Sequence, residues 1–140
     1  MNIIEKSLAI ALTAYSGRQD QAGGASILHP LRVMGRMTTE DEMAAALLHQ
    51  VVEGSTYTSK GLMEAGIPSH VVGAVECLSR VEGESDENFI SRVQSNPLAT
   101  AVMIADLKDH MDLQRFNRLG DEELAHVAGY HKAWKQLTQS

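Results

Sequence analysis

The chain has 140 residues, of which 44% are hydrophobic, a length that supports one substantial core rather than two. Eighteen acidic residues against 12 basic ones give a formal net charge of −6, and Lys and Arg nowhere form a cluster. Both facts argue against a nucleic-acid partner, because a phosphate backbone is repelled unless a local basic patch overrides the charge. We therefore expect a single domain over residues 1–140, whose phosphorylated partner, if it has one, is small.

The apolar segments are all too short to cross a membrane. None approaches the roughly 18 uninterrupted apolar residues of a spanning helix, and residues 1–14 carry no basic leader. We expect no membrane partner and a cytoplasmic location. Composition leaves the oligomeric state open, so a homo-oligomer is compatible with it.

Helical periodicity dominates the chain, because apolar residues recur three and four positions apart almost throughout. Capping residues, acidic first turns, prolines and glycines mark where each helix begins and ends. From these signals we expect helices near residues 3–15, 30–37, 39–53, 59–65, 69–79, 86–94, 97–116 and 121–137. No segment shows the alternation of a strand. The predicted fold class is all-α, a single helical bundle.

Potential metal ligands occur in three of these segments. His29 stands at a helix entrance, His49 in the apolar middle of the helix at 39–53, and Asp106 directly after the apolar run 102–105. Burying an aspartate there is costly unless its charge is compensated. If the three segments pack together, two imidazoles and a carboxylate converge, which is a ligand set suited to Zn, Mn or Fe.

Spacing also relates two further residues to this set. His49 and Glu53 lie four positions apart, as do Asp106 and His110, so each pair shares a face of its predicted helix. A simpler interpretation stays open at this point. A lone histidine in an apolar helix is more often a hydrogen-bonded core residue than a ligand, and Asp106 can instead pair with a nearby Lys or Arg.

Three segments match published sequence patterns in order and separation. Residues 14–33 are similar to AHxGQxRKxGxPYIxHPLxVA, residues 45–54 to AALLHDVVEDT, and residues 104–111 to LADRLHNM. These patterns belong to the HD superfamily of metal-dependent phosphohydrolases, in particular the small alarmone hydrolases related to the hydrolase domain of Rel and SpoT proteins. The chain resembles that family over residues 8–115, and the resemblance implies an HD-domain bundle with Mn(II) as cofactor.

The resemblance also implies roles for individual residues. His29, His49 and Asp106 stand where the family has three metal ligands, and Glu53 stands at the first of its two catalytic acids. Gln50 replaces the aspartate of the HD pair, and a neutral amide is a weaker ligand for a divalent cation. Gly54 replaces the second catalytic acid and brings no side chain.

Five further residues differ from the family patterns at positions that would contact the substrate or the metal. They are Asp20 and Gln21 at a basic pair, Met103 at a lysine, Tyr15 at a histidine and His110 at an asparagine. The first three remove positive charge that would bind a nucleotide carrying two pyrophosphate groups. One hypothesis compensates: His110, one turn beyond Asp106, supplies a fourth protein ligand. The alternative is that His110 fills space and binds water.

The resemblance implies a metal-dependent phosphohydrolase similar to guanosine-3′,5′-bis(diphosphate) 3′-pyrophosphohydrolases, acting on a small phosphorylated nucleotide. The changes at positions 50 and 54 predict weak or altered activity. The alternative is a catalytically inactive HD-fold module that binds a nucleotide or a protein, with no metal required. A helical interaction protein is the third possibility, in which Met34, Met37, Met43 and Met63 form an adaptable contact surface.

Overall fold

The computed structural model describes residues 1–19 and 24–139. Within these ranges the prediction of an all-α fold is confirmed, because the only strand-like pairing is an isolated bridge between Gln19 and Ala25. Asp20 and Gln21, which stand where the family pattern has a basic pair, lie outside the described residues.

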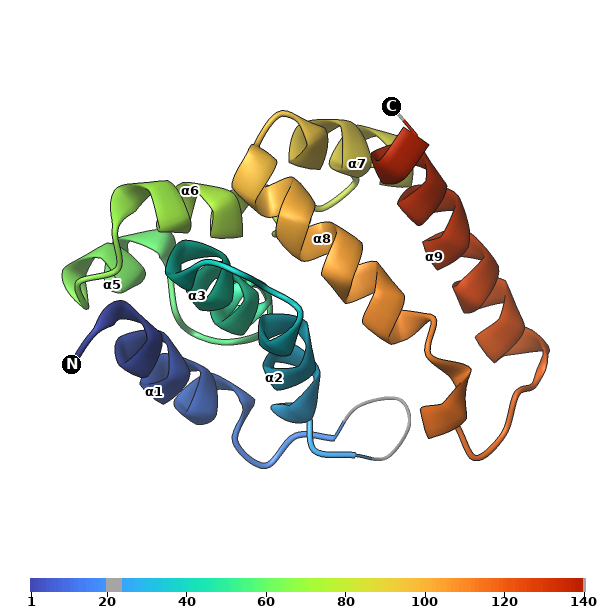
Figure 1. Ribbon diagram of the computed structural model, residues 1–140, viewed down its shortest axis with the longest axis horizontal. Helices are drawn as coiled ribbons and strands as arrows, with labels where there is room; N and C mark the ends of the chain where they lie inside the picture. Colours follow the sequence, from blue (N-terminus) through green and yellow to red (C-terminus); the bar gives the residue numbers. More distant parts are fainter. Residues whose placement is uncertain (20–23, 140) are drawn as a thin grey trace.

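The helices follow one another with short connections (Figure 1). In chain order they are α1 (Ile3–Tyr15), α2 (Leu28–Gly35), α3 (Glu40–Leu48), α4 (Val51–Gly54), α5 (Ser59–Glu64), α6 (Ser69–Cys77), α7 (Asp86–Gln94), α8 (Pro97–His110), the 3₁₀ turn η1 (Leu113–Arg115) and α9 (Asp121–Gln139). The predicted ends at Gly17 and Gly66 are confirmed, and both glycines adopt positive φ, 76° and 95°.

Side-chain caps explain where the two helices that matter most for the site begin. The Thr39 side chain accepts a hydrogen bond from the backbone N–H of Glu42, and the Glu42 carboxylate accepts one from the backbone N–H of Thr39, so α3 starts with a capping box. Asn96 accepts from the N–H of Ala99, and Pro97 occupies the first turn of α8.

α8 runs through the middle of the molecule (Figure 1). It packs against α2 and α3 on one side and against α7 and α9 on the other. α3 is the most enclosed element, since residues 44–48 are fully buried and α3 also contacts α1 and α6. The site histidines and carboxylates therefore approach one another where α2 and the end of α3 meet the second half of α8.

Two predicted helices differ from the structure. The helix expected over 39–53 is interrupted at His49 and Gln50, because His49 Nδ1 bonds the carbonyl of Ala46, the group that the Gln50 N–H would bond in a continuous helix. The helix expected to reach residue 116 ends at His110. Asp112 adopts an extended conformation beyond it and its side chain accepts from the N–H of Gln114, which starts η1 instead.

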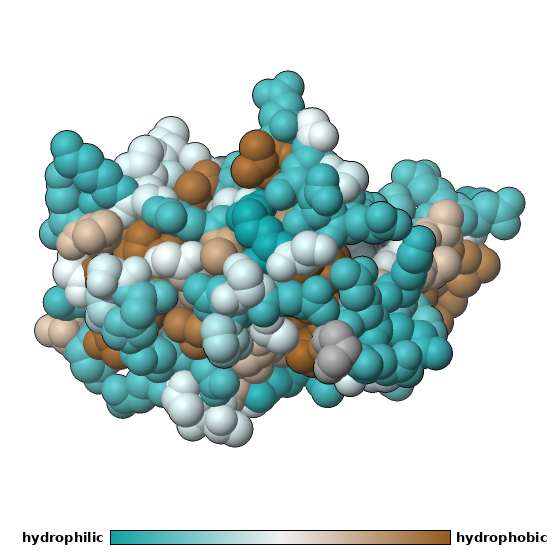
Figure 2. Space-filling model, turned by 90° about the horizontal axis from the view of Figure 1, so that it is seen from above, coloured by the Kyte–Doolittle hydropathy of each residue, from teal (hydrophilic) through white to brown (hydrophobic). Residues whose placement is uncertain are grey.

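The face of the molecule seen in Figure 2 is largely hydrophilic, with apolar side chains in separate patches. Of the four methionines expected to form a contact surface, Met63 is 52% exposed, while Met34, Met37 and Met43 are half-buried. Among the described residues, no helix is both long and apolar enough to span a bilayer.

Candidate metal centre

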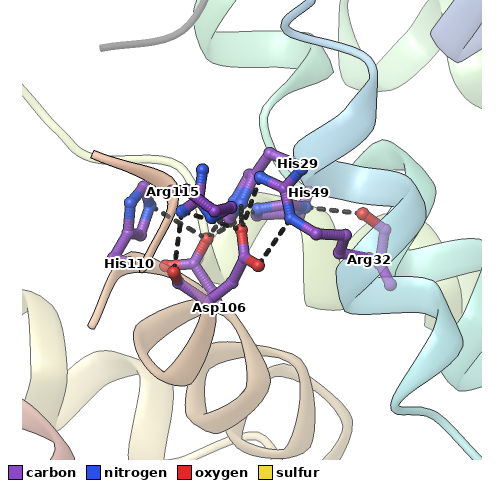
Figure 3. A network of polar contacts seen from close by, with 8 residues as sticks. His29, Arg32, His49, Asp106, His110 and Arg115 are labelled. Atoms are coloured by element: carbon purple, nitrogen blue, oxygen red, sulfur yellow. Dashed lines mark hydrogen bonds and ion pairs between the residues drawn. The ribbon is translucent and has the colours of Figure 1, made fainter. Parts of the chain in front are cut away.

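Three segments that are distant in sequence meet at one buried point (Figure 3). His29 comes from the first turn of α2, His49 from the residue after α3, and Asp106 from the penultimate turn of α8. Their exposed fractions are 6%, 3% and 5%, so all three are buried. The structure thus brings together the three residues that sequence analysis expected to converge.

A single oxygen is the centre of this arrangement. Asp106 Oδ1 lies 2.7 Å from His29 Nε2 and 2.9 Å from His49 Nε2. The two imidazole rings are tilted at 59° with centroids 5.2 Å apart. Both histidines therefore direct the same ring nitrogen at the same carboxylate oxygen.

The other nitrogen of each ring is already committed to an oxygen. His49 Nδ1 donates to the carbonyl of Ala46 at 2.5 Å, and His29 Nδ1 donates to Asp109 Oδ2 at 2.5 Å. A neutral imidazole carries one proton, so each ring in its neutral form turns an Nε2 lone pair toward Asp106. Each of the two lone pairs then faces Asp106 Oδ1 at hydrogen-bond distance with no proton between them, and a shared cation resolves that repulsion. This donor set fits a divalent metal ion.

His110 belongs to the same cluster. Its Nε2 lies 3.5 Å from Asp106 Oδ1, and its ring centroid lies 4.6 Å from that of His29. His29, Asp106 and His110 each offer one ligand atom, and these three atoms all lie within 4.8 Å of one another. The three residues together could therefore hold a metal ion. The His110 side chain is 29% exposed, so it is less enclosed than the side chains of His29, His49 and Asp106.

Gln50 and Glu53 lie differently from the sequence expectation. Gln50 is half-buried and precedes α4, and its side chain makes no capping hydrogen bond. Because the helix breaks at residues 49–50, His49 and Glu53 do not share one helix face. Glu53 is exposed, and its Oε1 accepts the backbone N–H of Arg80 at 2.5 Å. The carboxylate is thus anchored to the start of the segment that follows α6.

Two tyrosines border the cluster. The hydroxyl of Tyr15, at the end of α1, is buried beside the backbone of Gln50. Burial, and then the charges of Asp106 and Glu53, raise the pKa of that hydroxyl, so both carboxylates lie near it. Tyr130 of α9 stacks on His110 with ring centroids 4.8 Å apart. Tyr15 thereby connects the neighbourhood of Glu53 to the candidate ligands.

Sequence analysis missed a second buried carboxylate, Asp109. It is 1% exposed and contacts His29, and Arg32 Nε and Nη2 donate to its two oxygens at 2.7 and 3.0 Å. Arg115 Nη2 lies 3.6 Å from Oδ2 and donates to the Asp109 backbone carbonyl at 2.8 Å. The available signal was an aspartate three residues beyond Asp106, a spacing that places both carboxylates on neighbouring positions of the helix surface. No sequence signal indicated Tyr130.

The pKa values of these groups follow from their partners. Burial alone would lower the pKa of His29, but hydrogen bonds to Asp106 and Asp109 raise it to about 9. Burial alone would raise the pKa of Asp106, yet hydrogen bonds from His110, His29 and His49 hold it well below its usual range. In the metal-free protein a proton on His29 thus occupies the position that a cation would take.

Comparisons with known proteins agree with this architecture. No protein-family model matches the sequence. The solved structure of a metazoan ortholog of SpoT that hydrolyses ppGpp superposes with a TM-score of 0.74 over 98% of this chain and 85% of that one, at 20% sequence identity. The chain therefore shares its fold with that SpoT ortholog. The resemblance inferred from the sequence is therefore confirmed at the level of the fold.

The sequence is also similar to that of one curated protein. The sequence is 28% identical over 130 residues to the "Probable GTP pyrophosphokinase" of Mycobacterium leprae (strain TN). The match covers 83% of this chain and 16% of that protein, so the chain spans about a sixth of the length of this relative.

Proposed function

We propose that this chain is a divalent-metal-dependent phosphohydrolase of the HD type, with Mn(II) as its metal and a small nucleotide bearing a pyrophosphate group as its substrate. One observation carries the proposal: two buried imidazoles direct Nε2 at the same oxygen of Asp106. The similarity to a structure whose protein hydrolyses ppGpp supports the substrate class.

His29, His49 and Asp106 would hold the metal, and His110 would complete the set. A divalent cation bound there supplies Lewis acidity toward a phosphoryl oxygen and activates water as a nucleophile. The side chain of Gln50 is neutral and adds no charge, so we expect weaker metal binding than with an aspartate at that position. We therefore also expect low activity at limiting metal concentration.

Glu53 would act as the proton acceptor. Its Oε1 is held by the Arg80 N–H at 2.5 Å, which fixes the carboxylate and leaves Oε2 to take a proton from the attacking water. The side chain is exposed, so substrate can reach it. Because Gly54 stands in place of a second acid, Glu53 would be the single carboxylate available for proton transfer. We therefore expect a turnover rate about 10²- to 10⁴-fold lower than with both acids present.

Positive charge near the two tyrosines would bind the phosphates. The charge of Arg18 acts on the hydroxyl of Tyr15, and that of Arg80 acts on the hydroxyl of Tyr130. The negative charge of Asp106 raises the pKa of both tyrosine hydroxyls. We infer that Arg18 and Arg80, whose guanidinium also pairs with Asp86 Oδ1 at 2.7 Å, replace part of the basic charge missing at Met103.

The test is a pair of measurements on the full chain. Purified without chelator, the protein should contain divalent metal by mass spectrometry, and with Mn(II) it should release pyrophosphate or phosphate from members of a nucleotide panel. Asp106→Asn should lose both metal and turnover, whereas Glu53→Gln should keep the metal and lose turnover. Asp41→Asn, which alters an exposed histidine–aspartate pair with His70, should change neither. Absence of metal from the replete wild-type protein would end the proposal.

A nucleotide-binding module without turnover is the second candidate. The position of Glu53, the single remaining acid, favours this function. Glu53 is exposed, and the helix break at residues 49–50 means that it does not share a helix face with His49, so it is less well placed for catalysis. A protein that contains divalent metal and binds a nucleotide in calorimetry, yet releases no product, would have this second function instead.

A further inference from the structure

Asp109 is the least exposed charged side chain in the described part of the chain, at 1%. It lies in the last turn of α8, three residues beyond Asp106, and it accepts hydrogen bonds from His29 Nδ1 and from two nitrogens of Arg32. Arg115 Nη2 donates to its backbone carbonyl. Enclosing a carboxylate this fully is unfavourable unless it is paired, and these contacts supply the pairing.

The two aspartates of α8 bond opposite nitrogens of one imidazole. Asp106 Oδ1 lies 2.7 Å from His29 Nε2, and Asp109 Oδ2 lies 2.5 Å from His29 Nδ1. A ring held at both nitrogens cannot flip or rotate without breaking a buried hydrogen bond. When a metal ion replaces the proton on Nε2, Asp109 keeps the other proton on Nδ1, so the nitrogen that faces the candidate metal centre is the one that offers a lone pair.

Asp109 also changes the charge balance around the centre. Gln50 contributes no negative charge beside His49, whereas Asp109 adds one behind His29. A carboxylate bonded to the far nitrogen of an imidazole increases the basicity of the ring as a ligand. The charge absent at position 50 is therefore partly restored through His29, from a residue outside the ligand set.

We propose that Asp109 is a positioning residue that fixes the tautomer and orientation of His29 and strengthens metal binding, offsetting the neutral side chain at position 50. This inference deepens the proposed function and rests on it for the presence of metal. Arg32 serves the arrangement by holding both oxygens of Asp109, at 2.7 and 3.0 Å. Its fork–carboxylate geometry orients Oδ2 toward the ring.

The experiment compares four forms of the full chain: wild type, Asp109→Asn, Asp109→Leu and the control Asp41→Asn. The control removes the charge from another histidine–aspartate pair, Asp41 with His70 at 2.7 Å, which is exposed and remote in sequence from α8. Affinities for Mn(II) and Zn(II) are measured by calorimetry, and folding by circular dichroism. The ring nitrogens of His29 are observed by long-range ¹H–¹⁵N NMR, with and without Zn(II).

We expect Asp109→Leu to bind both metals about 10- to 100-fold more weakly, the range found when a partner of a metal-bound histidine is removed, with Asp109→Asn intermediate and the control unchanged. The Nδ1–H signal of His29 should persist in the wild type and disappear in Asp109→Leu. Wild-type affinity in a folded Asp109→Leu protein would overturn the inference. If that variant does not fold, Asp109→Asn decides by the same criterion.

Failure of the proposed function gives a different pattern. A wild-type protein that binds neither metal removes the hydrolase proposal, and the metal-free spectra then decide the role of Asp109 by themselves. A wild-type Nδ1–H signal that Asp109→Leu or Asp109→Asn loses supports positioning of His29, and identical spectra in all forms overturn it.

Discussion

At the scale of single residues, the centre depends on what each imidazole does with its second nitrogen. His49 Nδ1 bonds the carbonyl of Ala46, and His29 Nδ1 bonds Asp109, so each ring presents Nε2 to Asp106. Neither bond was predicted from the sequence. The ligands that the sequence indicated are thus oriented by partners that it did not.

Position 50 offers the sharpest test of a single residue. We expect Gln50→Asp to increase Mn(II) affinity by at least about tenfold, since even an outer partner of a metal ligand contributes that much. Gln50→Asn is the matched control, because it has the size of Asp without the charge. Calorimetric titration of the two variants measures the difference. Equal affinities would show that residue 50 is not near the cation.

The candidate ligands were predictable because a polar residue in an apolar helix is conspicuous, and Asp106 follows four apolar residues. Asp109 was passed over because its meaning depends on contacts 77 and 80 residues away, with Arg32 and His29. Tyr130 reaches His110 from a helix whose packing side the periodicity does not specify. Local pattern finds the unusual residue, whereas only tertiary packing finds its partner.

At the scale of elements, most boundaries followed from caps and glycines, and α7 was predicted at its observed limits, residues 86–94. The two errors have one kind of cause. At His49 and at Asp112 a side chain takes a backbone group that a continuing helix would use, and such competition is invisible in the apolar periodicity. The break after α3 matters for function because it separates Glu53 from the helix face of His49.

Another side chain joins the end of α6 to α7. Arg92 donates to the carbonyls of Glu76, Cys77 and Ser79 and also to the carboxylate of Glu84. These bonds satisfy carbonyls at a helix terminus, and the ion pair keeps the guanidinium in place. The connection over residues 78–85 is therefore fixed by one arginine and its carboxylate.

This pairing gives a dependence of stability on pH. The hydrogen bond from Arg92 lowers the pKa of Glu84 below its ordinary value of 4.5, so the ionised form is favoured in the folded state. A group with a lowered folded pKa stabilises above its unfolded pKa and loses that contribution as pH falls through the folded value. Glu84→Gln should thus be less stable than wild type at pH 7, and the difference should shrink below about pH 4.5.

Urea unfolding of both proteins from pH 7 to pH 3 measures this difference. Glu82→Gln, a neighbouring exposed glutamate, is the control and should show a smaller effect. A Glu84 variant whose stability deficit stays constant down to pH 3 would refute the assignment.

At the scale of the whole molecule, the centre joins segments that local structure leaves independent. Asp106 on α8 bonds His29 across 77 positions of sequence and His49 across 57. These bonds span the contact of α8 with α2 and with the end of α3, on the side of α8 away from α9 (Figure 1). A cation held by all three side chains therefore links the first half of the chain to the second.

Metal should accordingly stabilise the fold as a whole. A ligand that binds only the folded state adds about 2.7 kcal/mol to the free energy of unfolding at a hundredfold excess over its Kd. We expect Mn(II) to raise the midpoint of thermal unfolding and a chelator to reverse the effect. His49→Ala should lose the response, while His70→Ala, at an exposed histidine, should keep it. An equal response in both variants would place the metal elsewhere, because only His49 belongs to the cluster that joins the two halves.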